Sequence, residues 1–135
     1  MIQEKFKPLR IYKASAGSGK TFTLAVEYIS LLAINPMEYQ NILAVTFTNK
    51  ATAEMKQRIL GTLYGIANAL PSAEAYIEPI LASVKSKINS PQYDGLDKDS
   101  IIIKDKDTLS DRAKEALSNI IHDYSRFHVE TIDSF

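Results

Sequence analysis

The residues with the clearest chemical potential form the run A-S-A-G-S-G-K-T, from Ala14 to Thr21. Gly17 and Gly19 can adopt backbone angles closed to other residues, so the chain can pass close to a ligand. Successive N–H groups of such a loop point inward at an anion, and the positive end of a following helix adds to the attraction. Lys20 can reach the β- and γ-phosphates of a nucleotide, and the Thr21 hydroxyl can bind Mg²⁺. The run therefore predicts a phosphate-binding loop.

This run departs from the pattern G-x-x-x-x-G-K-[ST] at its first position, where Ala14 replaces glycine. Its flanks are those that such a loop needs, an apolar stretch over residues 9–12 and a helical pattern that begins near Thr21. The alternative is a Gly/Ser turn followed by a chance Lys-Thr pair. We predict Lys20 as the catalytic residue and Thr21 as the magnesium ligand. The predicted nucleotide-binding residues are Ala14, Ser15, Ala16, Gly17, Ser18, Gly19, Lys20 and Thr21.

A second polar cluster, T-F-T-N-K-A, runs from Thr46 to Ala51, where a predicted strand ends and a helix begins. In open α/β sheets, ligands bind beyond the carboxyl ends of the strands. Hydroxyls, an amide and a helix N-terminus can hold a phosphate backbone there, and Phe47 can offer a flat face to an unstacked base. The alternative is a capped helix with Phe47 in the core. The residues alone leave both open.

The elements that must position these residues follow from the apolar pattern. Residues 9–14 read as a short buried strand, and a helical face then recurs from Phe22 to Ala33 until Asn35-Pro36. The continuous apolar run 42–47 is typical of a strand buried on both faces, as in a parallel sheet. A second helix follows from Lys50 to Leu70. We therefore predict an α/β fold with a right-handed strand–helix–strand unit.

The second half of the chain reads as mostly helical. Pro79 predicts two short helices within 72–88, and residues 89–107 are rich in turn formers. A helix is predicted over 108–124, with Thr108 and Asp111 as a capping box and with Ile121 and Tyr124 on its apolar face. Residues 127–132 alternate as a strand.

Composition limits the classes of protein that fit. The chain has 135 residues, which suits one domain, and its lack of cysteine excludes disulfides and thiolate metal sites. No apolar run approaches the roughly 20 residues of a membrane span, so we expect a cytoplasmic protein without a membrane partner. The net charge is zero, but residues 1–70 hold 8 basic and 4 acidic side chains, whereas residues 71–135 hold 8 and 12. The basic excess thus lies in the half with the predicted phosphate loop.

Three segments together resemble a known family. The run I-L-A-V-T-F-T-N-K-A-T-A-E-M-K-Q-R-I, residues 42–59, resembles motif Ia of superfamily 1 helicases of the UvrD/Rep type. The run A-S-A-G-S-G-K-T resembles their motif I. The closing F-H-V-E-T-I-D-S-F, residues 127–135, resembles the strand and T-x-H-x-F motif of the RecB and AddA branch, with Asp133 where many members have histidine. The T-F-T-L after Lys20 favours the same branch.

The resemblance implies a partial P-loop NTPase (RecA-like) domain, with a parallel sheet, flanking helices and a helical insertion. It implies three parts: a core over 1–70 with the P-loop and motif Ia, a helical insertion over 71–125, and a strand with the start of the next motif over 126–135. It further implies an ATP-driven translocase that uses Mg²⁺ and moves 3′ to 5′ on single-stranded DNA. RecB and AddA relatives also carry a nuclease, so exonuclease activity in double-strand break repair and a nuclease partner subunit are expected. The implied DNA-binding residues are Thr46, Phe47, Thr48, Asn49, Lys50, Thr131 and Ser134.

Parts that a complete motor needs are not found in the sequence. No apolar strand ends in Asp-Glu, no arginine finger can be placed, and a second motor domain is absent. We therefore expect the N-terminal part of a longer protein, which alone hydrolyses ATP negligibly. The alternatives are a P-loop nucleotide kinase or GTP-binding switch, and a non-catalytic nucleotide-binding module that binds a protein partner.

Overall fold

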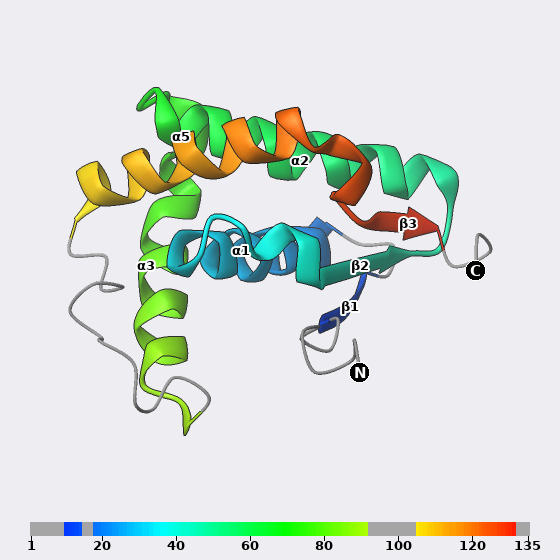
Figure 1. Ribbon diagram of the computed structural model, residues 1–135, viewed down its shortest axis with the longest axis horizontal. Coiled ribbons are helices and arrows are strands. Elements are labelled where there is room, and N and C mark those ends of the chain that lie inside the picture. The colour runs from blue at the N-terminus through cyan, green and yellow to red at the C-terminus, as the bar shows by residue number, and fades with distance from the viewer. Residues whose placement is uncertain (1–9, 15–17, 92–104, 132–135) are drawn as a thin grey trace.

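Three parallel strands form the sheet in the computed structural model, which describes residues 10–14, 18–91 and 105–131 (Figure 1). The strands β1 (Arg10–Ala14), β2 (Ile42–Thr46) and β3 (Val129–Thr131) lie in the order β1-β2-β3. The long helices are α1 (Ser18–Ile34), α2 (Asn49–Ala67), α3 (Glu74–Ile88) and α5 (Lys106–His122). Short 3₁₀ turns complete the described part: η2 (Glu38–Asn41), η3 (Pro71–Ala73) and η5 (Tyr124–Arg126). The predicted α/β class and parallel pairing are confirmed.

Strand β2 is the central strand and is buried at all five positions. Its burial confirms the prediction from the continuous apolar run, because a central strand of a covered parallel sheet meets side chains on both faces. The register aligns Ala14 of β1 with Thr46 of β2, and Thr46 with Thr131 of β3. All three strands therefore end at the same edge of the sheet.

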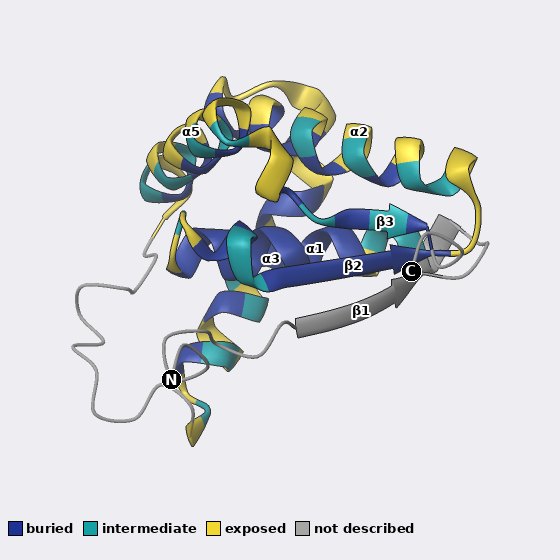
Figure 2. Ribbon diagram, turned by 45° about the vertical axis from the view of Figure 1, so that its right-hand side comes forward, coloured by how far each residue is buried: buried dark blue, intermediate teal, exposed yellow. Residues whose placement is uncertain are grey.

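Helix α1 lies at the centre of the molecule and is buried from Leu24 to Ile34 apart from the half-buried Glu27 (Figure 2). The buried Ser30 donates its hydroxyl hydrogen to the carbonyl of Val26 at 2.6 Å, so this hydroxyl is satisfied within the helix. The helix begins at Ser18, three residues before the predicted start. Ser18, Gly19 and Lys20 are not apolar, so the apolar pattern could not place the start of the helix there.

The remaining helices surround α1 and close one core. Helix α2 packs against β3 and along α5, while α1 contacts both α3 and α5. Apart from Leu43 and Val45 of β2, the buried apolar residues from Leu24 to Val129 form a single cluster. Within the described residues, no helix is both long enough and apolar enough to cross a membrane.

Two helix predictions were wrong in detail. Helix α3 runs without a break through Pro79. The carbonyl that Pro79 cannot bond is that of Ala75, in the exposed first turn, where water can replace the lost hydrogen bond. Helix α5 is capped by Asp105, whose carboxylate accepts the Thr108 N–H at 2.9 Å, so the helix starts two residues before the predicted capping box.

The predicted apolar faces also reach too far at their ends. Leu70 lies beyond the end of α2 and is 37% exposed, and Ile121 and Tyr124 are 60% and 47% exposed. Leu70 and Tyr124 lie beyond the ends of α2 and α5, and Ile121 follows the buried Ile120 on a side of α5 that the core does not cover. Periodicity shows which face of a helix is apolar, but it cannot show where the opposing layer stops.

Candidate functional site

The candidate site lies at the edge where the three parallel strands end. Strand β1 ends at Ala14 and α1 begins at Ser18, while β2 ends at Thr46 and α2 begins at Asn49. The register places Thr131 of β3 beside Thr46. The structure therefore brings the two predicted motifs and Thr131 to one edge of the sheet, with two helix N-termini beside them.

Both helices that start at this edge have no acidic residue in their first turn. By contrast, α3 and α5 carry Glu74 and Asp107 in theirs. An acidic side chain in a first turn offsets the partial positive charge of the helix N-terminus. The N-termini of α1 and α2 thus keep the charge that attracts an anion, as a phosphate site requires.

A hydroxyl relay connects the three elements at this edge. Thr52 Oγ1 lies 2.5 Å from Thr46 Oγ1 and 2.7 Å from Thr131 Oγ1. Thr131 in turn donates its hydroxyl hydrogen to Asn49 Oδ1 at 2.8 Å. Because Thr131 donates its hydrogen to Asn49, its oxygen is the acceptor in the contact with Thr52. The Thr46 and Thr52 hydroxyls also lie within donating distance of the Thr48 carbonyl oxygen, at 3.3 and 3.2 Å. These hydroxyl groups thus connect β2, α2 and β3 to the start of α2.

The relay ends on the carbonyl oxygen of Asn49, which leaves its amide nitrogen as a donor at the surface. Asn49 is exposed, and its Nδ2 has no partner among the described residues. The neighbouring Lys50 is also exposed. A donor and a cation are therefore held side by side at a helix N-terminus, which suits contacts with a phosphate backbone.

Helix α2 is capped by Thr48, whose hydroxyl oxygen accepts the Ala51 N–H at 3.0 Å. This part of the capped-helix interpretation is confirmed. Its other part, a buried Phe47, is wrong, because the Phe47 side chain is 51% exposed. This exposed ring, between the last residue of β2 and the N-cap of α2, remains available to stack on an unpaired base.

Sequence reasoning missed Thr52, which makes the central contacts of the relay. Its hydroxyl lies on the same helical face as Thr48, four residues earlier, and 3.2 Å from the Thr48 carbonyl. That spacing was the available signal. The contact with Thr131 spans 79 positions and could not be read from the sequence.

Other predicted site residues lie partly or wholly outside what the structure describes. Ser15, Ala16, Gly17 and Ser134 lie outside the described residues, and for Ala14, Ser18, Gly19 and Lys20 only the backbone is described. Thr21 is half-buried in the first turns of α1. Thr46 and Thr131 are buried under the edge, so they act through the relay more than through direct exposure.

Comparison with known proteins identifies the class to which this fold and site belong. The UvrD/REP helicase N-terminal domain model matches residues 3–135, and the chain belongs to this family. It is 42% identical over 81 residues to the RecBCD enzyme subunit RecB of Chlamydia muridarum, which covers 56% of this chain and 8% of the relative. RecB of Escherichia coli is 33% identical over 95 residues, with 62% and 8% covered. DNA helicase II of Haemophilus influenzae is 52% identical over 50 residues, with 37% and 7% covered.

The resemblance inferred from the three motifs is thus confirmed at the level of the family. No solved structure matches the chain. The chain spans less than a tenth of the length of the relatives named above. The activity of a whole protein of this kind is therefore a matter for proposal.

Proposed function

We propose that this chain is the ATP-binding part of the first motor domain of an ATP-dependent 3′–5′ DNA helicase. In this proposal it has the P-loop NTPase (RecA-like) fold, and its parent is a cytoplasmic RecB/AddA-like helicase–nuclease of double-strand break repair with a partner subunit. The observation that carries the proposal is the common edge, where Ala14, Thr46 and Thr131 lie in register in a chain of the UvrD/REP family. A motor needs its nucleotide loop and its DNA contacts on neighbouring strands so that one can move the other.

The α1 N-terminus is the proposed nucleotide site. Its first turn lacks acidic residues, which fits a polyanionic ligand such as ATP. Gly17, Gly19 and Lys20 would hold the phosphates, and Thr21 would offer its hydroxyl to Mg²⁺. Bound Mg²⁺ would neutralise part of the negative charge of the phosphates. The protein residues would bind and orient the triphosphate next to the end of β2.

The α2 N-terminus is the proposed path of single-stranded DNA. Phe47 would stack on a base, and Asn49 and Lys50 would contact the phosphate backbone. Thr46, Thr48 and Thr131 would hold these groups in place through the cap and the hydroxyl relay, and Ser134 would add a backbone contact. The relay joins Asn49 to Thr46, which lies beside the end of β1. The proposed DNA contacts would thereby be connected to the strand that precedes the proposed nucleotide loop.

The nucleotide role is tested by magnesium-dependent ATP hydrolysis in the full-length parent, with and without single-stranded DNA. We expect strong stimulation by DNA in the wild type and loss of hydrolysis in Lys20→Ala. Lys56→Ala is the matched control. Lys56 lies on α2, outside the proposed nucleotide site, and its Nζ is 5.5 Å from the centroid of the Tyr124 ring. Hydrolysis that does not depend on DNA would favour a kinase or switch, and no hydrolysis would favour a binding module.

The DNA role is tested by the affinity of the same parent for an oligothymidine strand. Phe47→Ala should weaken binding about tenfold, since stacking of one base on an aromatic ring contributes about 1–3 kcal/mol. Tyr64→Ala is the control, because Tyr64 has a similar exposure, 55% against 51%, but lies near the other end of α2. Equal losses in both variants would contradict a specific role for Phe47.

We expect the isolated 135-residue chain to lack a complete set of catalytic residues and therefore to hydrolyse ATP negligibly. Sequence motifs for activating the attacking water were not found in it. Robust magnesium-dependent turnover by the pure chain, abolished by Lys20→Ala, would contradict this expectation. The Lys20→Ala comparison is needed because a contaminating ATPase would survive it.

A further inference from the structure

Thr52 bonds through its side chain to two strands of the sheet. Its Oγ1 lies 2.5 Å from Thr46 Oγ1 at the end of β2 and 2.7 Å from Thr131 Oγ1 at the end of β3. Its backbone N–H donates to the carbonyl of the N-cap residue Thr48 at 3.0 Å, so Thr52 is also fixed within the first turn of α2. One half-buried side chain thus ties the start of α2 to the ends of both strands.

These contacts depend on the hydroxyl group of Thr52. Two hydroxyl groups that share a hydrogen atom approach to about 2.7 Å, whereas a methyl carbon needs roughly 3.5 Å from a neighbouring heavy atom. Thr46 and Thr131 are 1% and 6% exposed, so both are enclosed by the fold and leave little room for a larger separation. The Thr52 hydroxyl therefore sets the spacing between the first turn of α2 and the strand ends.

This spacing determines how Asn49 is held, because Asn49 begins the same helical turn. The Thr131 hydroxyl accepts from Thr52 and donates to Asn49 Oδ1 at 2.8 Å. The bond holds the oxygen of the Asn49 amide toward β3 and leaves the amide nitrogen as the outward donor. A contact of about 3.6 Å is no longer a hydrogen bond. A shift of less than roughly 1 Å at the start of α2 is therefore enough to release the amide.

A released Asn49 amide is a poorer donor to a phosphate than a held one. The side chain is exposed, so without the bond to Thr131 it turns about its own bonds and presents its oxygen as well as its nitrogen to solvent. A phosphate must then order the side chain on binding, and the lost rotamer freedom lowers the affinity. The bond to Thr131 removes that cost before the ligand arrives.

We propose that Thr52 is a positioning residue of the DNA site, and that its hydroxyl acts through Thr131 to hold the Asn49 amide with its nitrogen toward the phosphate backbone. The inference rests on the proposed DNA role of the α2 N-terminus. Thr52 makes no contact with DNA in this arrangement. Its loss changes how well Asn49 is placed and leaves the groups that touch DNA in the chain.

The test measures two quantities in the full-length parent: the affinity for an eight-nucleotide oligothymidine strand, and the strand concentration that gives half-maximal ATP hydrolysis. Thr52→Val keeps the size of the side chain but replaces the hydroxyl with a methyl group. We expect binding to weaken about fivefold, as for the loss of one hydrogen bond of average strength, and the half-maximal concentration to rise by the same factor. The hydrolysis rate without DNA and the maximal rate with DNA should stay unchanged.

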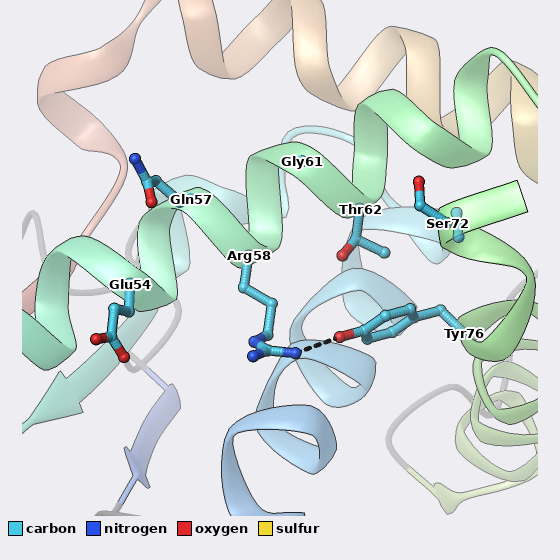
Figure 3. A pocket seen from close by; sticks show the side chains of 8 residues that line it. Glu54, Gln57, Arg58, Gly61, Thr62, Ser72 and Tyr76 are labelled. Atoms are coloured by element: carbon cyan, nitrogen blue, oxygen red, sulfur yellow. Dashed lines mark hydrogen bonds between the residues drawn. The ribbon is translucent and has the colours of Figure 1, made fainter. Parts of the chain in front are cut away.

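Two matched variants separate positioning from a general loss of stability. Thr52→Ser keeps the hydroxyl and should bind the strand as the wild type does. Thr62→Val removes the hydroxyl of a buried threonine ten residues further along α2, roughly 15 Å away. Figure 3 shows Thr62 on the part of α2 that lies near Tyr76 and Ser72, and its substitution should leave DNA binding unchanged.

A double-mutant cycle with Asn49→Ala tests whether Thr52 acts through Asn49. Once the amide is gone, Thr52 has nothing left to orient, so Thr52→Val should have no further effect on affinity in that background. Equal losses in both backgrounds overturn the proposal, as do wild-type affinity in Thr52→Val and weakened binding in Thr52→Ser. If the wild type binds no oligothymidine, or Asn49→Ala binds it as tightly as the wild type, the proposed DNA site itself is overturned, and the role of Thr52 with it.

Discussion

Two buried tyrosines differ in whether their hydroxyl groups find an acceptor. The Tyr39 hydroxyl donates to Asp123 Oδ2 at 2.9 Å and lies 3.3 Å from the carbonyl oxygen of Asn119. The Tyr28 hydroxyl is buried without a hydrogen-bond partner, and the Tyr28 ring meets Phe127 edge-on at 5.8 Å. The same substitution should therefore have opposite consequences at these two positions.

Tyr28→Phe should leave the free energy of unfolding unchanged or raise it by up to about 1 kcal/mol, because it removes an unpaired buried hydroxyl. Tyr39→Phe should lower it by about 1–2 kcal/mol, because it removes the 2.9 Å hydrogen bond to Asp123. Urea denaturation of both variants measures the difference. Equal losses would show that the Tyr28 hydroxyl has a partner after all.

The same two residues predict how stability depends on alkaline pH. Burial raises the pKa of the Tyr28 phenol far above its ordinary value of 10.0, and burial is also the largest cause of the raised pKa of Tyr39. Above about pH 10 the unfolded chain therefore loses protons that the folded chain keeps. Each such tyrosine therefore lowers the free energy of unfolding as the pH rises, for Tyr28 with a limiting slope of about 1.4 kcal/mol per pH unit. Urea titrations from pH 9 to 11.5 should show a shallower decline in Tyr28→Phe; an identical decline would contradict the assignment.

Single contacts also show where sequence reasoning stops. Glu54 and Arg58 are four apart on α2, which is the spacing of a surface ion pair on a helix. Arg58 instead donates to Tyr76, which follows it by 18 positions on another helix. The contact of Thr52 with Thr131 is likewise a product of the fold. Local spacing gives the candidates for a contact, and only the packed elements decide among them.

At the scale of the element, the strands and the existence of α1, α2 and α5 were predictable because each carries an unbroken apolar period. Their ends were not, since caps depend on single hydrogen bonds such as the one from Thr108 to Asp105. The continuity of α3 through Pro79 was also missed, because buried residues on both sides of the proline, Tyr76 and Ile80 among them, hold the helix together. The location of the site, at the carboxyl ends of the strands, was predictable from the sequence. The hydrogen bonds of the hydroxyl relay were not.

Two glycines of α2 that look alike in the sequence have different structural roles. A Cβ at Gly61 would meet open space, whereas a Cβ at Gly65 would lie 2.8 Å from the Ala73 Cβ. Gly65 is therefore what lets η3 pack closely against α2. In the sequence both read only as residues that weaken a helix.

Gly61→Ala should raise the free energy of unfolding by about 0.5–1 kcal/mol, since alanine loses less backbone freedom on folding than glycine. Gly65→Ala should lower it by about 1–3 kcal/mol, because η3 must move away. Thermal unfolding of the pair by circular dichroism measures both effects. A gain in both variants would mean that the contact with Ala73 yields without cost.

At the scale of the whole molecule, long-range contacts join the predicted insertion over 71–125 to the nucleotide half. Arg112 of α5 donates to the carbonyls of Ala33 and Ile34 at 2.7 and 3.3 Å, where α1 ends. A charged donor at a helix C-terminus satisfies carbonyls that have no partner within the helix. Lys87 of α3 pairs with Glu27 of α1 at 2.6 Å. These helices therefore help to hold α1, whose first turn carries the proposed nucleotide site.

If the core unfolds as one cooperative unit, a destabilising substitution in α5 must also destabilise the sheet. Leu109→Ala removes a fully buried side chain of α5 and should lower the free energy of unfolding by about 2–5 kcal/mol. Ile121→Ala, on the same helix but 60% exposed, should cost far less. Native-state hydrogen exchange gives the decisive comparison, because it reports Val45 of β2 and Ile120 of α5 separately. In Leu109→Ala both amides should exchange faster by the same factor. Faster exchange at Ile120 with unchanged exchange at Val45 would instead make 71–125 a separately folding insertion, whose loss the nucleotide and DNA edge could survive.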